Sequence, residues 1–385
     1  MRKVCLLGAS GSIGKQTLDV MKKNPSDFEL VGFSVGQRTQ KIHHVLRVFP
    51  NVKHICIAKK NKLSYYQKSY PEIHFYAGDK GLLDLIKDSK ADMVVNALVG
   101  FVGLKPTLFA LENNLDVCLA NKEALVVGGE LVNSLLKQGK GKLYPIDSEH
   151  SALKKCLMVD DQNINKLMLT ASGGAFRNLK REELDNVKAS DALKHPTWKM
   201  GPKITIDCAT MVNKSFEIIE AHYLFGYPYT QIGTKLHDES YVHSYILYKD
   251  GTMRLDVGKP DMRVPIKHAL YGYNIPFKTV LTDDLSKIKN CHFHDFDLKR
   301  YPIVEWAKTV INEKGTYGAV FNAANEVAVH AYLRDEITFL DIERIINKLM
   351  KEHKNIKHPT YEQLLDVDLA TRMSVYKMIK KGEIA

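Results

Sequence analysis

Two carboxylates, Asp147 and Glu149, lie two residues apart in the segment Tyr144–His150, directly after an apolar run. In an extended chain, side chains at positions i and i+2 point to the same side. Two ionised carboxylates on one side repel each other unless a cation lies between them or both face water. We interpret the pair either as part of a divalent metal site, whose usual ligands are carboxylate oxygens, or as a solvated strand end.

Two glycine-rich segments offer backbone amides to an anion. The first, Gly8-Ala9-Ser10-Gly11-Ser12-Ile13-Gly14, connects an apolar run to an amphipathic helical pattern. At such a turn, the free amides and the helix N-terminus can hold a pyrophosphate, so the segment predicts a dinucleotide site. An ordinary tight turn is the alternative. The second, Ala171-Ser172-Gly173-Gly174, is another candidate anion cradle.

The residues after the second predicted strand bear on the choice of nucleotide. Domains that bind NAD usually have an acidic residue there, which accepts hydrogen bonds from the ribose hydroxyls. This chain has Val35-Gly36-Gln37-Arg38, without a carboxylate. The guanidinium of Arg38 suits a 2′-phosphate, so the pattern favours NADP, unless Arg38 is an ordinary surface cation.

Three further positions could act on a ligand. Lys122 follows a predicted strand at the end where open α/β sheets bind their ligands. His195-Pro196-Thr197-Trp198-Lys199-Met200-Gly201 ends a highly charged stretch, which is typical of a lid; a satellite packing cluster would also explain Trp198. Lys214 and Glu217 share one helix face, and a surface ion pair is the alternative for them.

The elements that position these residues are predicted by periodicity. Short apolar runs alternate with helical patterns in the first third of the chain, which predicts a parallel sheet covered by helices, with strands at 4–7, 30–35, 54–58, 93–97, 116–120 and 143–146. Later elements are a strand at 167–170, a strand running into a helix over 204–217, and a hairpin with strands at 242–248 and 253–257. Helices follow at 304–311, 323–333, 340–350 and 361–380.

We therefore expect an α/β protein with several domains, which its 385 residues can accommodate. Residues 1–146 are predicted to form an N-terminal Rossmann-like dinucleotide-binding domain. Residues 147–258 are predicted to form a central α+β catalytic domain with the metal and substrate site and a flexible loop. A linker at 259–300 and a C-terminal helical domain at 301–385 complete the chain.

Charge and composition exclude some functions. The net charge is +11, but the 55 basic residues are interspersed with 44 acidic ones, so we expect anionic small molecules as ligands and no nucleic acid. No apolar run reaches the roughly 18 residues that span a bilayer. The early strand leaves no room for a signal peptide, and the six cysteines lack paired spacing, so we expect reduced thiols and a cytoplasmic protein.

Taken together, these motifs resemble the 1-deoxy-D-xylulose 5-phosphate (DXP) reductoisomerase family over essentially the whole chain. The resemblance also rests on Leu119-Ala120-Asn121-Lys122-Glu123, Asp207 to Glu217, Gly258-Lys259-Pro260-Asp261-Met262-Arg263 and Asn322-Ala323-Ala324-Asn325-Glu326. It implies a homodimeric oxidoreductase that uses NADPH and one divalent metal, Mg or Mn. Such an enzyme rearranges and reduces DXP, a phosphorylated sugar, to 2-C-methyl-D-erythritol 4-phosphate in isoprenoid precursor biosynthesis.

The resemblance also implies roles for individual residues. The metal ligands would be Asp147, Glu149 and Glu217, which with Lys122 would be the catalytic residues. The substrate would contact Lys122, Ser148, Glu149, Ser172, His195, Trp198, Cys208, Asn213, Lys214 and Glu217. NADPH would contact Ser10, Gly11, Ser12, Ile13, Gly36, Gln37, Arg38, Asn121, Glu123 and Gly201. Trp198 and Met200 would belong to a closing loop.

The chain departs from the usual family pattern at several positions. Cys208 stands where serine is usual, Gln37 where lysine is frequent, Ala9-Ser10 where Ser-Thr is common, and His237-Asp238-Glu239-Ser240 where His-Pro-Gln-Ser is usual. Two other functions remain open. A different NADP-dependent dehydrogenase would keep its activity after metal chelation, and a non-catalytic RNA-binding protein would bind RNA with a steep salt dependence.

Overall fold

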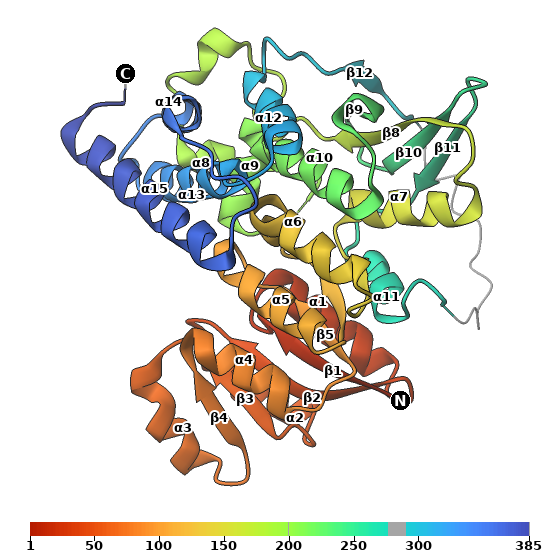
Figure 1. Cartoon of the computed structure of the whole chain (residues 1–385), viewed down its shortest axis with the longest axis vertical. Coiled ribbons are helices and arrows are strands. Elements are labelled where there is room, and N and C mark those ends of the chain that lie inside the picture. Colours follow the sequence, from red (N-terminus) through yellow and green to blue (C-terminus); the bar gives the residue numbers. More distant parts are fainter. Residues whose placement is uncertain (199, 276–289, 385) are drawn as a thin grey trace. The chain divides into compact units, whose positions relative to one another are not determined.

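The computed structural model describes residues 1–198, 200–275 and 290–384 (Figure 1). They divide into two compact units, each with a sheet of its own. The first contains residues 1–124, 131–147 and 261–275, and the second contains 125–130, 148–260 and the described residues after 289. The helices in these ranges are too short or too polar to span a lipid bilayer. The six cysteines are free thiols, as expected.

The first unit is built on a seven-stranded sheet of order β4-β3-β2-β1-β5-β6-β7, and its neighbouring strands pair in parallel. The strands are β1 (Arg2–Leu7), β2 (Phe28–Val35), β3 (His54–Ile57), β4 (His74–Ala77), β5 (Met93–Asn96), β6 (Asp116–Leu119) and β7 (Leu143–Pro145). Its helices are α1 (Ser12–Lys23), α2 (Lys41–Val48), α3 (Leu63–Ser69), α4 (Gly78–Asp88), α5 (Leu104–Glu112) and α11 (Arg263–Leu270). Helix α6 (Glu123–Lys137) contributes residues 125–130 to the second unit. The predicted Rossmann-like sheet is confirmed, with β4 added.

Burial on both faces explains why this sheet was recognisable in the sequence. Val4, Leu6, Phe33, Ile55 and Val95 lie on central strands and are fully buried. Parallel strands covered by helices on both sides require apolar residues at nearly every position. The strands therefore appear in the sequence as continuous apolar runs.

The turn between β1 and α1 requires glycine at two positions. Gly8 has a φ of +87°, and a Cβ there would lie 2.5 Å from the Ala97 carbonyl oxygen. A Cβ on Gly14 would lie 2.2 Å from the Gly8 oxygen. The Gly11 N–H donates to that same oxygen at 3.0 Å and closes the turn. The backbone can make this tight approach only without side chains.

The second unit contains a five-stranded sheet of order β11-β10-β8-β9-β12, in which only β8 and β9 pair in parallel. The strands are β8 (Ile164–Ala171), β9 (Ile232–His237), β10 (Val242–Tyr248), β11 (Met253–Val257) and β12 (Phe293–Asp295). Its first helices are α7 (Ser148–Val159), α8 (Ala189–Ala192), α9 (Pro202–Thr210) and α10 (Val212–Phe225). The hairpin of β10 and β11 matches its prediction.

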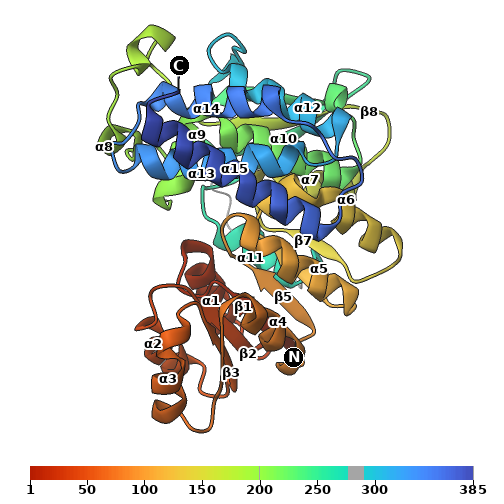
Figure 2. The same ribbon diagram turned by 60° about the vertical axis from the view of Figure 1, so that its left-hand side comes forward.

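The second unit ends in the predicted group of helices, which are α12 (Trp306–Glu313), α13 (Tyr317–Tyr332), α14 (Phe339–Glu352) and α15 (Tyr361–Lys381). Helix α13 packs against both α14 and α15 (Figure 2). Nearly all of its residues are buried, which explains its almost continuous run of small and apolar residues.

Two local predictions were wrong. Residues 202–210 form helix α9 and not a strand, because Gly201 caps a helix that Pro202 begins and Ile206 and Ala209 bury one face of it. Burial thus overrides the strand preference of β-branched residues. Helix α7 begins at Ser148, so Asp147 and Glu149 do not lie on one extended strand.

The predicted domain boundaries remain a prediction. The expected linker at 259–300 includes residues 276–289, which lie outside the described part of the chain, and it includes α11 of the first unit.

Gly318 provides a test of how α13 packs. A Cβ at this position would lie 1.9 Å from the Val126 carbonyl oxygen, within the second unit. Replacing glycine with alanine inside a helix normally raises the free energy of unfolding by about 1 kcal/mol. We expect Gly318→Ala instead to lower the free energy of unfolding by about 3 kcal/mol, because backbone atoms must move apart. Urea denaturation measures this. Gly258→Ala is the control, since its Cβ would meet only His243 Nε2 at 3.7 Å.

Candidate active site

A buried group of charged residues lies between α7 and α10 in the second unit. The ammonium of Lys214 is 3.1 Å from Glu149 Oε1, pairs with Glu217, and donates to the Thr170 carbonyl at 2.5 Å. Lys214 and Glu217 are only 2% and 1% exposed. Burial alone would lower the pKa of Lys214, but Glu149 and Glu217 outweigh it and raise that pKa above its ordinary value. Lys214 is therefore charged and offsets part of the negative charge of these two carboxylates.

Glu217 is held in one orientation by its neighbours. Asn213 Nδ2 donates to Glu217 Oε1 at 2.5 Å, and His150 Nε2 donates to the Glu217 carbonyl at 2.8 Å. His150 Nδ1 is 3.3 Å from Glu220 Oε2, and both side chains are buried. Sequence reasoning missed this supporting pair, because neither residue forms a motif with Glu217.

In the first unit, Lys122 and Asp147 form a largely buried ion pair, with Lys122 Nζ 2.5 Å from Asp147 Oδ2. Asn121 Nδ2 donates to the Gly100 carbonyl at 3.0 Å and to Glu123 Oε2 at 2.9 Å, and its Oδ1 accepts from the Ala124 N–H at 3.1 Å. The side chains of Asn121 and Glu123 thus fix the start of α6.

The predicted metal ligands form a suitable donor set. In the described part of the chain, more than one group of side chains could hold a metal ion. One of these groups consists of Asp147, Glu149 and Glu217. They offer only carboxylate oxygens, which suit a hard cation such as Mg or Mn. Because only one residue separates Asp147 from Glu149, their Cα atoms can be no more than roughly 7 Å apart.

The second anion cradle is assembled around Ser172 and His195. Ser172 Oγ and His195 Nε2 are 3.0 Å apart. His195 Nδ1 accepts from the N–H groups of Thr197 at 3.2 Å and Trp198 at 3.0 Å, so the ring proton is on Nε2. Burial, with a smaller contribution from Arg177, lowers the pKa of His195 to about 4. His195 is therefore a neutral hydrogen-bond donor.

Close packing brings the backbone of Cys208 to the same cradle. Gly173 and Gly174 have φ values of +84° and +69°, and a Cβ on Gly174 would lie 2.7 Å from the Cys208 carbonyl oxygen. The Ser172 loop therefore lies against the end of α9. The bond from Lys214 to Thr170, two residues before Ser172, ties this cradle to the acidic group.

The predicted lid also lies in the second unit. The rings of Trp198 and His243 are 6.1 Å apart, and Thr197 Oγ1 is 3.2 Å from Ser240 Oγ. Gly201 caps α9, and Lys199 lies outside the described residues.

Ser148, another predicted substrate contact, is the first residue of α7. Its Oγ donates to Glu149 Oε2 at 2.5 Å.

The predicted nucleotide residues of the first unit lie at the ends of two neighbouring strands. Ser10, Gly11, Ser12 and Ile13 follow β1, and the exposed residues 36–38 follow β2. Two bonds tie the turns together, from the Ala9 N–H to the Ser34 carbonyl at 2.8 Å and from the Gly8 N–H to Ser34 Oγ at 2.9 Å. Arg38, three residues after the end of β2, is exposed.

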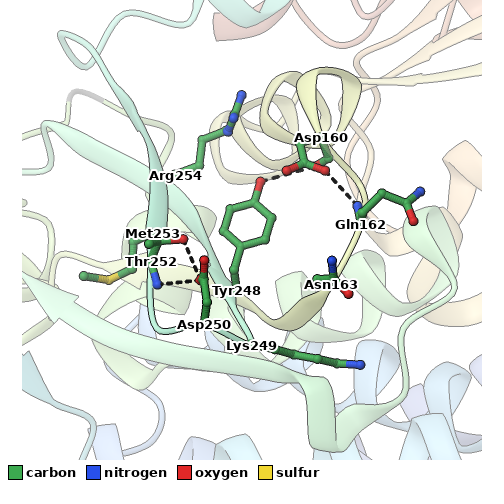
Figure 3. A pocket seen from close by; sticks show the side chains of 9 residues that line it. All are labelled: Asp160, Gln162, Asn163, Tyr248, Lys249, Asp250, Thr252, Met253 and Arg254. Atoms are coloured by element: carbon green, nitrogen blue, oxygen red, sulfur yellow. Dashed lines mark hydrogen bonds between the residues drawn. The ribbon is translucent and has the colours of Figure 1, made fainter.

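A shallow cavity of about 520 Å³ lies elsewhere, between the end of α7 and the β10–β11 hairpin (Figure 3). Tyr248 Oη donates to the Asp160 carbonyl across it at 3.3 Å. None of the predicted site residues lines it, so this cavity does not mark the active site.

The parallel sheet with its glycine turn, the acidic group and the anion cradle define a class of protein, the dinucleotide-dependent α/β enzymes with a metal and anion site. Three family models match the chain. They are 1-deoxy-D-xylulose 5-phosphate reductoisomerase at residues 4–129, its C-terminal domain at 143–225, and the DXP reductoisomerase C-terminal domain at 257–374.

Similar proteins agree with these models. A 1-deoxy-D-xylulose 5-phosphate reductoisomerase 2 of Bacillus thuringiensis subsp. konkukian is 43% identical over 98% of this chain and 100% of its own length. A solved DOX-P reductoisomerase with NADPH, fosmidomycin and magnesium is 31% identical, with a TM-score of 0.92 over 99% of this chain and 98% of that one. The Zymomonas mobilis enzyme with NADPH is 32% identical, with a TM-score of 0.89 over 98% of this chain and 99% of that one. The chain belongs to the DXP reductoisomerase family, which confirms the resemblance.

The lowered pKa of His195 predicts a pH-dependent stability. Below pH 6.5 the unfolded chain protonates this histidine, whereas the folded chain does not until about pH 4. The unfolded state then binds more protons, so the contribution of His195 to stability is complete above pH 6.5 and is lost as the pH falls toward 4.

The matched variant is His195→Gln, which keeps a donor at the Nε2 position but does not titrate. Urea denaturation across this range should show that the wild type loses more stability on acidification than the variant. Parallel pH profiles for the two proteins would contradict the assigned protonation state.

Proposed function

We propose that this chain catalyses the NADPH- and metal-dependent rearrangement and reduction of DXP to 2-C-methyl-D-erythritol 4-phosphate. The observation that carries the proposal is the 43% identity over 98% of the chain to a named DXP reductoisomerase. The internal geometry of each unit supports it, because the buried carboxylates, the anion cradle and the glycine turn each have a place in this reaction.

Asp147, Glu149 and Glu217 are proposed to hold one Mg or Mn ion. When bound, such an ion supplies positive charge that polarises a carbonyl group and stabilises a developing oxyanion. Lys122 and Lys214, which pair with these carboxylates, are donors for substrate oxygens. Ser148 Oγ bonds to Glu149 and is a further candidate contact at the reacting end of the substrate.

The phosphate of the substrate is proposed to bind at the Ser172 cradle. The Ser172 hydroxyl, the His195 Nε2–H and the Cys208 thiol would donate to it, with Asn213 and Lys214 on the neighbouring helix. Trp198 and Met200 would cover the bound substrate. Binding energy from a phosphate distant from the reacting carbons can drive closure of such a loop.

NADPH is proposed to lie along the ends of β1 and β2. The amides of residues 10–13 and the N-terminus of α1 would hold the pyrophosphate. Residues 36–38 would contact the 2′-phosphate. Asn121 and Glu123 would shape the site through the turns that they fix, and Gly201 through the start of α9.

The activity test is NADPH oxidation by the purified protein with DXP, measured with Mg, with Mn and after complete chelation. Oxidation that needs both DXP and a divalent ion is expected. Activity that survives chelation would favour a metal-independent dehydrogenase, and absence of turnover with all combinations would contradict the proposal.

We also propose that the protein is a cytoplasmic homodimer. Each chain would consist of the four segments predicted from the sequence, which are the dinucleotide-binding domain, the catalytic domain, the linker and the helical domain. Strand β11 is an edge strand of its sheet, and Met253, Leu255 and Val257 on it are 58%, 41% and 44% exposed. Apolar edge strands favour pairing with another chain. Sedimentation analysis at micromolar concentration tests this, and a monomer would contradict it.

Replacing Glu217 tests the metal assignment. Glu217→Gln keeps the size of the side chain but removes one ligand charge, so the Mg concentration for half-maximal activity should rise more than about tenfold. Turnover should fall, whereas NADPH affinity, measured by fluorescence, should not change. Glu182→Gln, on an exposed segment, is the control. An unaltered metal requirement in Glu217→Gln would remove Glu217 from the ligand set.

Replacing Arg38 tests the nucleotide assignment. Loss of a charge-assisted bond to the 2′-phosphate should raise the KM for NADPH by about tenfold or more. The KM for NADH should change little, since NADH lacks that phosphate. Arg47→Ala, an exposed arginine on α2, is the control. Equal effects on both cofactors would show that Arg38 does not discriminate between them.

A further inference from the structure

Arg177 lies against the anion cradle in a way that the family motifs do not explain. Its Nη1 donates to the Ser172 carbonyl at 3.2 Å and to the Asp238 carbonyl at 3.0 Å. A Cβ on Gly173 would lie 2.6 Å from Arg177 Cβ. Glycine at position 173 therefore allows the arginine side chain to fold back onto the cradle.

The segment that carries Arg177 is anchored on both sides. Gly174 lies against the backbone of Cys208 and Ala209, and Phe176 packs edge-on against Phe339 at 5.1 Å. The Phe176 carbonyl also accepts from Arg300 Nη2 at 3.3 Å. The guanidinium consequently has a fixed position relative to Ser172.

A second cation beside the cradle would help to balance the charge of a bound phosphate. A phosphate monoester carries close to two negative charges at neutral pH, since its second pKa is about 6. Ser172, Cys208 and Asn213 are uncharged donors, and His195 is neutral. Lys214 shares its single positive charge with Glu149 and Glu217. An arginine is always protonated, and Arg177 is close enough to His195 to contribute to its lowered pKa.

The carboxylate of Asp238 offsets part of the positive charge of Arg177. Its Oδ1 is 4.0 Å from Arg177 Nη1, and its Oδ2 is 3.2 Å from His294 Nε2. In this chain a carboxylate therefore lies behind the guanidinium and opposes its field.

We infer that Arg177 is a positioning residue of the phosphate site, that it supplies positive charge to the cradle beyond that of Lys214, and that Asp238 weakens this effect. The inference rests on the proposed function for the identity of the substrate. It does not depend on turnover, because the probe in the first experiment is inorganic phosphate.

The first experiment compares Arg177→Met, Arg177→Lys and the control Arg181→Met. Arg181 pairs with Glu343 and donates to the Arg300 carbonyl, so it shares the segment but not the cradle. Phosphate affinity is measured by calorimetry and by competition against DXP. Arg177→Met should weaken phosphate binding and raise the KM for DXP at least about tenfold, with kcat changed less than about threefold and NADPH affinity unchanged. Arg177→Lys should recover part of the loss.

The second experiment uses Asp238→Asn, which keeps the backbone acceptor and removes the charge. Phosphate should bind about two- to threefold more tightly at low salt, and the gain should shrink as ionic strength rises. NMR titration should show a higher pKa for His195 in Arg177→Met than in the wild type, an effect that a packing role alone does not produce.

The outcomes separate the inference from the proposed function. Wild-type protein that binds phosphate through Arg177 but never turns over DXP would contradict the function alone. Turnover of DXP together with equal phosphate affinity in wild type and Arg177→Met would overturn the inference. Equal affinity in wild type and Asp238→Asn would overturn the role of Asp238. If Arg177→Met does not fold, the lysine and Asp238→Asn variants decide the same question.

Discussion

The buried charge of Glu217 is the constraint on which the second unit depends. An ionised carboxylate that is 1% exposed is stable only if a cation and hydrogen-bond donors surround it. Lys214 and Asn213 meet that need from the same helix, and His150 fixes the backbone of Glu217. Lys214 also donates to the Thr170 carbonyl, near the end of β8 and two residues before Ser172. The acidic group and the anion cradle thus share one electrostatic support.

The glycine turn of the first unit depends on steric constraints. The turn exists because Gly8 and Gly14 have no side chains where the Ala97 carbonyl and the Gly8 carbonyl approach. Ser34 then ties this turn to the end of β2 through two hydrogen bonds. A nucleotide site formed in this way is preorganised by the backbone, so its side chains are free to vary.

The sequence was informative where local patterns determine structure, and uninformative where distant residues meet. Continuous apolar runs gave the central strands, but β4 was missed because Phe75 is its only buried residue at the edge of the sheet. The β-branched residues near Ile204 suggested a strand, although burial against the rest of the unit makes them helical. The pairing of Lys214 with Glu149 joins residues 65 positions apart, and only the family resemblance placed them in one site. Arg177 could not be recognised, because the acceptors of its hydrogen bonds are the main-chain carbonyls of Ser172 and Asp238.

The partners of Lys214 in this structure differ from the ligand that the family resemblance assigns to it. The family resemblance assigns it to the substrate phosphate, whereas the structure pairs it with two carboxylates. Both are anions, and a buried ammonium must be paired with whichever is present. On the proposed function, Lys214 would be available to the phosphate to the extent that a bound cation meets the charge of Glu149 and Glu217. A permanently charged group such as Arg177, which is not committed to these carboxylates, would then be needed to make the cradle attractive to phosphate in either state.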